Sequence, residues 1–364
     1  MYPYGVASDT IYQTEGEKKM RYALAVIIPA YNVEQYIEQA VLSVTSQNTG
    51  DNIIIICVDD GSKDKTGQIL DRLTKEHKDV AVIHQKNSGV SAARNTGMQY
   101  VFDNSLSEYI MFLDGDDIWF SGCFEKMLPE LKKSFDIVLF DSCIANESLT
   151  RRSDSSHRFS GVVAGGKEAY SKGVQTICSE AYRTDFLSKA NICFHNGQTH
   201  GEDMNFAMEA RYTAKECLFT NHLMYVYRTR KGSAVHSKRS ATDHYTTIIG
   251  GWLNTYHSLA EKGIDCPDAY GAAVYYLSDM VMDHFREHGS RKEISDRLDL
   301  FNDIICETGN PPARQFNPYL SRFSKSYELK QNLIGYAMDA GRLLLRIPPV
   351  RLLRDLKRFP IPMK

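Results

Sequence analysis

The stretch IIIICVDDGS, residues 53–62, joins an unbroken apolar run to a polar turn. Strands that are covered on both faces, as in parallel sheets, carry apolar side chains without polar alternation. Residues 53–58 therefore predict a buried parallel strand. Residues 59–62 predict the loop at the carboxyl end of that strand, because Asp, Gly and Ser favour turns.

Strands and helices alternate on both sides of this stretch. Apolar runs predict further strands at residues 24–28, 80–84 and 109–113. Apolar residues at helical spacing predict the intervening helices, at Ile37, Ala40, Val41 and Val44, at Ile69, Leu70 and Leu73, and at Val90, Ala93 and Met98. This alternation predicts an α/β fold with a mostly parallel sheet flanked by helices. Such sheets bind ligands at the carboxyl ends of their strands, so we expect the loops after Ile28, Val58, His84 and Leu113 to share one crevice.

The length of 364 residues suits two domains, since a domain usually has roughly 100–200 residues. We predict a polar lead-in at residues 1–20, the α/β domain at 21–238, a mostly helical C-terminal region at 239–340 and a basic tail at 341–364. The prediction of a helical C-terminal region rests on the helical patterns at residues 268–288 and 292–306.

The composition indicates a soluble globular protein, with 43% hydrophobic and 24% charged residues. The net charge of -2 gives no reason to expect nucleic-acid binding. The eight cysteines are scattered without a C-x-x-C pair, which argues against zinc and disulfides and favours a cytoplasmic location. We find no signal-peptide pattern and no run of the roughly 20 apolar residues that span a bilayer. A homodimer stays open.

Polar side chains occupy all four predicted strand-end loops. Tyr31 in the first loop offers an aromatic face for a base, and Asp60 in the second can accept a hydrogen bond from a ring N–H. Arg94, after the third, can present a planar fork to a phosphate or a carboxylate. Asp114 and Asp116 flank Gly115, and such a carboxylate pair suits Mg²⁺ or Mn²⁺ bridging a diphosphate. The alternatives are an ordinary turn at 114–117 and helix-capping loops at 29–32 and 59–62.

In this order, the four loops resemble the motifs of the family 2 glycosyltransferases, which are inverting enzymes of the GT-A fold. The resemblance covers residues 22–236 and includes the Glu-Asp segment at residues 201–206 and the Arg and Gly-Ser segment at residues 227–233. It implies transfer of a hexosyl or N-acetylhexosaminyl group from a nucleotide-sugar to a hydroxyl of a glycan or lipid-linked glycan of the cell surface. The nucleotide is by family habit UDP, with GDP and dTDP as alternatives. Residues 141–200 are expected to select the acceptor.

The resemblance also implies roles for single residues. Asp203 is the expected general base, and Asp116 with Asp114 is expected to hold Mn²⁺ or Mg²⁺. His236 is a further candidate metal ligand, with a surface histidine as its alternative. For Asp203 the alternative is a carboxylate favoured by the helix dipole. The expected donor-binding residues are Pro29, Ala30, Tyr31, Asn32, Asp60, Ser62, Asn87, Gly89, Arg94, Asp114, Gly115, Arg228 and Arg230.

Two other functions compete with glycosyl transfer. A nucleotidyltransferase normally carries a glycine-rich, arginine-containing loop after its first strand, which residues 29–32 are not. A non-catalytic sugar-binding module would need no base, whereas Asp203 is present. Residues 161–167 imitate a phosphate-binding P-loop, but Glu168 replaces the required Ser or Thr. We predict a loop leading into a helix there.

The tail carries seven Lys or Arg residues against one acid, Asp355, interleaved with apolar residues and broken by Pro348-Pro349. A basic amphipathic segment of this kind can lie on an anionic membrane surface. We therefore expect a peripheral protein on the cytoplasmic face of the plasma membrane. The alternative is a helix packed on the α/β domain with its charges in water.

Overall fold

The structure is a computed structural model. It describes residues 22–47, 50, 52–150, 152–153, 159–173, 176–198, 200–230, 241–266, 268–269 and 272–273, with the side chains of 241–246 excepted. The predictions for residues 1–20, for His236, for the helical patterns beyond residue 273 and for the tail at 341–364 lie outside these residues.

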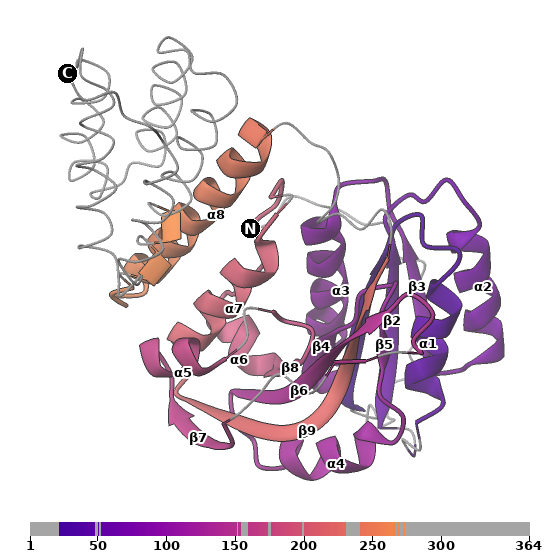
Figure 1. The fold of residues 1–364 in the computed structure, drawn as a ribbon, viewed down its shortest axis with the longest axis horizontal. Helices are drawn as coiled ribbons and strands as arrows, with labels where there is room; N and C mark the ends of the chain where they lie inside the picture. The colour runs from indigo at the N-terminus through magenta and orange to yellow at the C-terminus, as the bar shows by residue number, and fades with distance from the viewer. Residues whose placement is uncertain are drawn as a thin grey trace, which may run out of the picture.

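Nine strands of the described chain form one sheet, in the order β3-β2-β1-β4-β8-β6-β9-β5, with β7 paired to β9 (Figure 1). The strands are β1 Tyr22–Ala30, β2 Ile53–Asp59, β3 Val80–His84, β4 Ser107–Phe112, β5 Ile118–Trp119, β6 Ile137–Asn146, β7 Gly161–Ala164, β8 Glu180–Arg183 and β9 Glu216–Thr229. Strands β1 to β4 are parallel to one another, whereas β8 runs antiparallel to both β4 and β6. The four predicted strands are confirmed.

Helices follow the strands in the predicted alternation. They are α1 Ile37–Thr45, α2 Thr66–Glu76, α3 Val90–Asn104, α4 Cys123–Leu131, α5 Lys167–Lys172, α6 Thr184–Lys189, α7 Glu202–Thr213 and α8 Ala241–Glu261. Helices α1 and α2 lie on one side of the first strands, and α3 lies on the other with α6 and α7 (Figure 1). The predicted apolar positions of α1 are all buried against the sheet.

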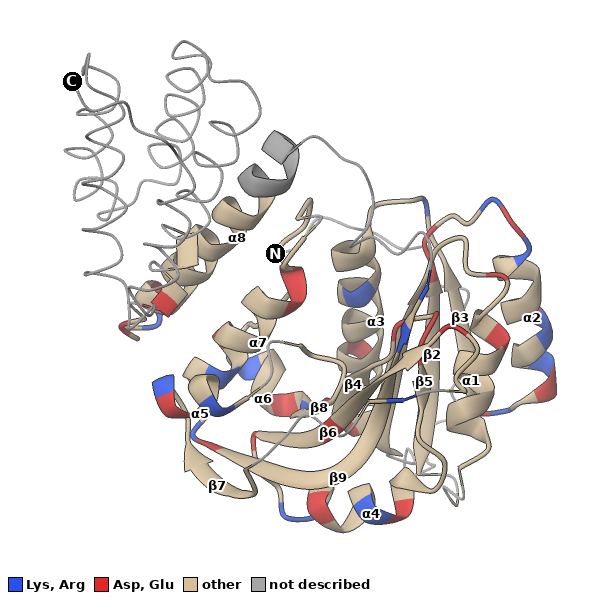
Figure 2. Cartoon of the chain, in the orientation of Figure 1, with Lys and Arg blue, Asp and Glu red and all other residues tan. Residues whose placement is uncertain are grey.

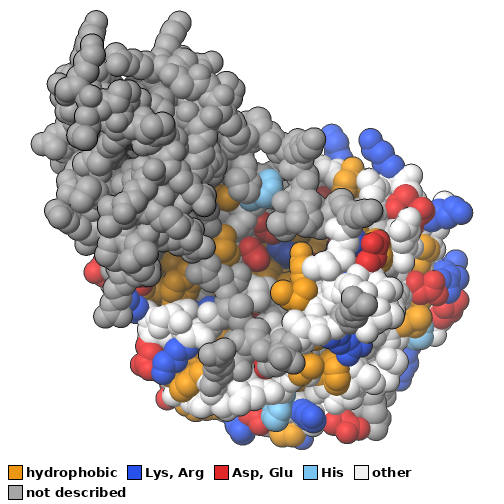
Figure 3. Space-filling view, in the orientation of Figure 1, with side chains coloured by type: hydrophobic (Ala, Val, Ile, Leu, Met, Phe, Trp, Pro, Cys, Tyr) orange, Lys and Arg blue, Asp and Glu red, His pale blue; other side chains and the backbone are white. Residues whose placement is uncertain are grey.

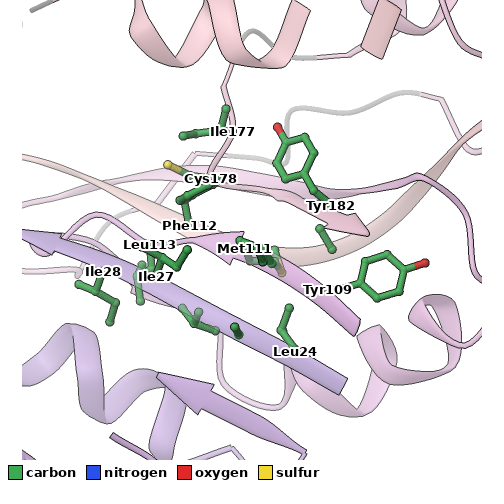
Figure 4. Packing of buried hydrophobic residues seen from close by; sticks show 14 of the residues in the cluster. Leu24, Ile27, Ile28, Tyr109, Met111, Phe112, Leu113, Ile177, Cys178 and Tyr182 are labelled. Carbon is green, nitrogen blue, oxygen red and sulfur yellow. The ribbon is translucent and has the colours of Figure 1, made fainter. Parts of the chain in front are cut away.

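The core lies on both faces of β1 and β4, and Figure 4 shows side chains of these strands beside Tyr182 and Cys178. Helix α3 lies very close to β1 because residue 97 is a glycine. A Cβ added at Gly97 would lie 2.5 Å from Cγ2 of Ile27. This close contact holds the middle of α3 against the middle of β1.

The prediction of a loop at residues 161–166 is wrong for its first four residues. Gly161–Ala164 form β7, which pairs antiparallel with β9. Strand β9 is 14 residues long and offers a further edge to this segment, and Val163 is buried while Val162 is exposed. The predicted helix does begin at Lys167.

Beyond residue 238 the described chain is helical, as predicted, but it does not stand apart. Helix α8 packs on α7 along its length and buries Ile248, Ile249, Trp252, Leu253 and Leu259 (Figure 1). Within the residues that the structure describes, none of the helices combines the length and the apolar character needed to cross a membrane.

Candidate active site

The first two strand-end loops bind each other through short polar contacts. The backbone N–H of Asn32 donates to Oγ of Ser62 at 3.1 Å, and the N–H of Lys63 donates to Oδ1 of Asn32 at 2.8 Å. Asn32 has a left-handed backbone, with φ of 52°, which an asparagine tolerates better than most residues. Tyr31 beside it is 44% exposed, so its ring is free to contact a ligand.

Asp60 joins the second loop to the third. Asp60 is only 3% exposed. Its carboxylate accepts hydrogen bonds from the side-chain amide of Gln85 at 2.7 Å and from the N–H groups of Ser88 and Gly89 at 2.9 and 2.8 Å. Its own N–H donates to the carbonyl of Ala30 at 2.9 Å. Asp60 thus organises three loops, a role that the sequence did not suggest. Asn87 is exposed at the same edge.

The fourth loop, residues 114–117, which we call the acidic loop, closes on the first. A Cβ at Gly115 would lie 3.2 Å from the carbonyl oxygen of Pro29. Only a glycine allows this approach without displacement of the neighbouring chain. The four loops predicted to share a crevice are therefore joined in the structure.

Arg94 lies almost fully buried between two carboxylates. Its Nη2 donates to Oδ1 of Asp114 at 2.8 Å and its Nη1 donates to Oε1 of Glu202 at 3.0 Å. From the sequence, Arg94 could bind either a phosphate or a carboxylate, and in the structure it binds two carboxylates. Arg94 links the acidic loop to the start of α7, which Figure 2 shows as an acidic segment beside α3.

Asp114 has a second neighbour that sequence reasoning missed. The Cys178 thiol lies 3.7 Å from Oδ2 of Asp114. Burial raises the pKa of Cys178 well above its usual value, so the thiol is protonated and can donate to the carboxylate. Nothing in the spacing of the cysteines pointed to this contact, because 64 residues separate the two side chains.

Asp116 and Asp117 differ in environment although they are adjacent. Asp116 and Arg230 have side chains that are each 21% exposed, and Nε of Arg230 donates to Oδ2 of Asp116 at 2.5 Å. Asp117 is buried and accepts hydrogen bonds from the hydroxyl of Tyr225 and from the N–H of Arg228. Burial, and then the charges of Asp114 and Asp116, raise the pKa of Asp117 well above its usual value.

Arg228 is committed to internal contacts. Its guanidinium donates to the carbonyl of Asp116 at 2.7 Å, to the carbonyl of Glu147 at 2.9 Å and to Oε1 of Gln39 at 2.6 Å. Both Arg228 and Arg230 lie over the ring of Tyr36, at 5.1 and 5.4 Å from its centroid. Arg228 therefore holds the acidic loop in place, while Arg230 presents a more exposed charge.

Asp203 lies in the first turn of α7, next to Glu202 and hence next to the link through Arg94. Burial raises the pKa of Asp203 to about 7, and the negative charge of Glu202 adds to the effect. A carboxylate with this pKa is a far better proton acceptor near neutral pH than an ordinary aspartate. The charges of Arg94 and Asp114 both act on the Asp203 carboxyl group, so the structure brings these three residues together. On the visible face, Figure 3 shows acidic and basic side chains close to one another.

A divalent cation at this site would take two carboxylate ligands from the described residues and its other ligands from substrate or water. No group of three or more His, Cys, Asp or Glu side chains that could hold a metal occurs among the described residues. Mg²⁺, however, is commonly held by one or two carboxylates together with substrate phosphates and water. Asp116 and Asp114 can supply the carboxylates, whereas His236 lies outside the part that the structure describes.

The chain is similar to known glycosyltransferases. The sequence model of Glycosyl transferase family 2 matches residues 25–191. The uncharacterized glycosyltransferase EpsJ of Bacillus subtilis is 30% identical over 58% of this chain and 62% of its own. The minor teichoic acid biosynthesis protein GgaB of the same organism is 32% identical over 67% of this chain and 26% of its own. The chain thus spans less than two thirds of the length of either relative.

A solved structure shares the fold. Residues 1–349 of TarS from S. aureus, in complex with UDP-GlcNAc, superpose with a TM-score of 0.60 at 19% sequence identity, over 86% of this chain and 90% of that one. This likeness confirms the predicted GT-A fold class. The family match ends at residue 191, so Asp203, Arg228 and Arg230 lie beyond it and are placed in the site by the tertiary structure.

Proposed function

The chain belongs to glycosyl transferase family 2, and from this premise we propose that it is an inverting glycosyltransferase of cell-surface polysaccharide synthesis. It transfers a sugar, of the hexosyl or N-acetylhexosaminyl type, from a nucleotide-sugar to a hydroxyl of a glycan or lipid-linked glycan. One observation carries the proposal. Arg94 connects Asp114, which follows β4, with Glu202 beside Asp203, so one arginine joins the acidic loop to the turn that carries the proposed base.

The donor in this proposal is a UDP-sugar. The TarS structures with UDP-GlcNAc and UDP support this choice through the shared fold. Tyr31 offers its exposed ring to the base, and Asn32, Ser62, Asn87 and Gly89 belong to the neighbouring loops that contact one another. Asp60 acts mainly by holding these loops together, which keeps the nucleoside site in shape.

The proposed leaving-group side is formed by the acidic loop and Arg230. Asp116 and Asp114 would hold Mn²⁺ or Mg²⁺, and such a cation would neutralise charge on the departing diphosphate. Arg230 places a second positive charge beside Asp116. Arg228 keeps the backbone of the acidic loop in position through its bond to the carbonyl of Asp116.

Asp203 is the proposed base on the acceptor side. It takes the proton of the acceptor hydroxyl as that oxygen attacks the anomeric carbon, and the bond from this carbon to the diphosphate oxygen breaks. One displacement of this kind inverts the anomeric configuration. The raised pKa of Asp203 favours proton acceptance near neutral pH. GgaB, named for teichoic acid biosynthesis, supports a cell-surface polymer as the acceptor.

The test is a screen of nucleotide-sugars with and without Mn²⁺. Donor binding is read by thermal shift, and transfer is read by release of the nucleoside diphosphate when acceptor glycans are added. A shift that needs both the cation and one donor is expected, because a ligand that binds only the folded protein stabilises it. Asp116→Ala is expected to lose the metal-dependent part of the shift and the transfer activity. Full transfer by Asp116→Ala would overturn the metal-assisted mechanism. Binding of donor without any turnover would support the non-catalytic alternative.

A further inference from the structure

Helix α8 covers the segment that carries Asp203. Two adjacent glycines of α8, Gly250 and Gly251, have different surroundings there. Among the residues that the structure describes, no atom of another element lies within 4 Å of the position of a Cβ added at Gly250. At Gly251 an added Cβ would lie 2.2 Å from Nε2 of Gln198 and 2.4 Å from Oδ1 of Asn205. Of these two neighbouring positions on α8, therefore, only Gly251 lies in a tight contact with other described residues.

The two side chains under Gly251 determine how α7 begins. Nε2 of Gln198 donates to the carbonyl of His200 at 2.9 Å and to Oδ1 of Asn205 at 2.5 Å. The N–H of Asn205 donates to the carbonyl of Gly201 at 3.1 Å, which forms the first turn of the helix. Asp203 lies inside this turn. The Gln198–Asn205 pair therefore spans the turn from the chain before it to the helix itself.

The opposite side of this pair is also held. The hydroxyl of Ser91, at the start of α3, lies 3.4 Å from the carbonyl of Gln198. Gly201 has a left-handed backbone, with φ of 70°, and lies beneath Ile248 of α8. The turn that carries Asp203 is thus enclosed between α3 and α8.

Polar contacts further along fix α8 on α7. Glu209 is buried on α7, and its Oε1 accepts hydrogen bonds from Oγ of Ser258 and from Nζ of Lys262, both at 2.5 Å. The hydroxyl of Tyr212 bonds to Asp268. A buried carboxylate with two donors is costly to separate from them, so α8 keeps a fixed position relative to α7.

We propose that α8 is part of the active site's framework and that Gly251 is a positioning residue for Asp203. The close approach of α8 at Gly251 presses the Gln198–Asn205 pair into the arrangement that aims Asp203 at the acceptor. The inference rests on the proposed role of Asp203. It means that residues 21–238 alone do not form the complete catalytic unit.

Gly251→Ala tests this inference, with Gly250→Ala as its matched control. Both substitutions add one methyl group to the same helix. Both also raise the helix propensity, because alanine is a better helix former than glycine. Gly250→Ala is expected to leave transfer and donor binding unchanged. Gly251→Ala is expected to lower kcat for transfer by about tenfold or more, since small misplacements of reacting groups are that costly. Its Kd for the UDP-sugar stays within about twofold, because the donor loops lie elsewhere.

A double variant separates the proposed contact from general damage. If the new methyl group acts by displacing Asn205, Gly251→Ala/Asn205→Ala transfers no more slowly than Asn205→Ala alone. The inference is overturned if Gly251→Ala behaves like Gly250→Ala, or if it weakens donor binding as much as it lowers kcat. Full transfer by Asp203→Asn would instead overturn the base assignment in the proposed function, and the inference with it.

Discussion

Nε of Arg230 donates to Oδ2 of Asp116 at 2.5 Å. The carboxylate proposed to hold a cation is therefore paired with the arginine that comes directly after β9. The arginine and a metal ion would use the same carboxylate. The two positive charges are therefore expected to compete for Asp116 when no donor is bound.

Arg230→Gln is expected to bind Mn²⁺ more tightly than the wild type in the absence of nucleotide. A partly exposed ion pair contributes about 0.5–1 kcal/mol, so the expected gain is about two- to fivefold in Kd. Electron paramagnetic resonance of free Mn²⁺ measures it directly. Arg152→Gln, which removes an arginine stacked on Phe120, is the control and should leave Mn²⁺ binding unchanged. Equal affinities of Arg230→Gln and wild type would contradict the competition.

The transfer rate is expected to depend on the ionisation of Asp203. Since burial raises the pKa of Asp203 to about 7, kcat should fall about tenfold per pH unit below pH 7 and level off above it. Glu202→Gln removes the neighbouring negative charge and should move this midpoint to lower pH. Asp203→Asn should abolish the pH dependence together with most of the activity. A profile that is flat between pH 5 and 8 in the wild type would argue against Asp203 as the base.

The same shift makes a prediction for stability. The pKa of Asp203 is higher in the folded protein than in the unfolded chain, where it is about 3.9. The folded state therefore binds more protons between pH 4 and pH 7, and the free energy of unfolding falls as the pH rises through this window. Asn cannot ionise, so the free energy of unfolding of Asp203→Asn does not fall in this way as the pH rises. The variant should therefore be more stable than the wild type at pH 8 and should lose that advantage toward pH 4. Urea unfolding at both pH values measures the difference.

Removal of the Arg94 side chain should destabilise the fold. Arg94→Met leaves Asp114 and Glu202 without their shared partner, and breaking a buried ion pair on one side costs about 3–5 kcal/mol. Because Asp114 is about one third exposed, the lower end of this range is expected. Arg72→Met, at a solvent-exposed pair with Glu38 and Glu76, is the control and should change little. Denaturant unfolding that gives equal losses for the two variants would contradict the structural role of Arg94.

Deletion of residues 341–364 should reduce sedimentation with anionic vesicles while donor hydrolysis is retained. The basis is the basic amphipathic pattern of this segment, since clustered Lys and Arg are attracted to anionic headgroups. Neutral vesicles provide the control, because they lack the charge that attracts the tail. Unchanged sedimentation with anionic vesicles would contradict a membrane-binding role of the tail.

The sequence by itself determined the α/β alternation and the loops that form the site. Buried parallel strands must be apolar throughout, so residues 24–28 and 53–58 identify themselves without knowledge of their neighbours. The position of the strand-end loops follows from the same topology, which is why the sequence predicts that the loops of Asp60 and Asp116 lie close together. The segment at 161–164 was missed as a strand because it forms only through pairing with the distant β9.

Only the tertiary structure decided what these side chains do to one another. Three contacts join residues that are far apart in the chain. They are the pairing of Arg94 with Asp114 and Glu202, the contact of Cys178 with Asp114, and the contact of Gly251 with Asn205. The pKa of Asp203 likewise depends on burial and on neighbouring charge, neither of which is encoded in local sequence. Local patterns fix secondary structure through backbone periodicity, whereas charge and position in a site depend on distances that only the folded chain defines.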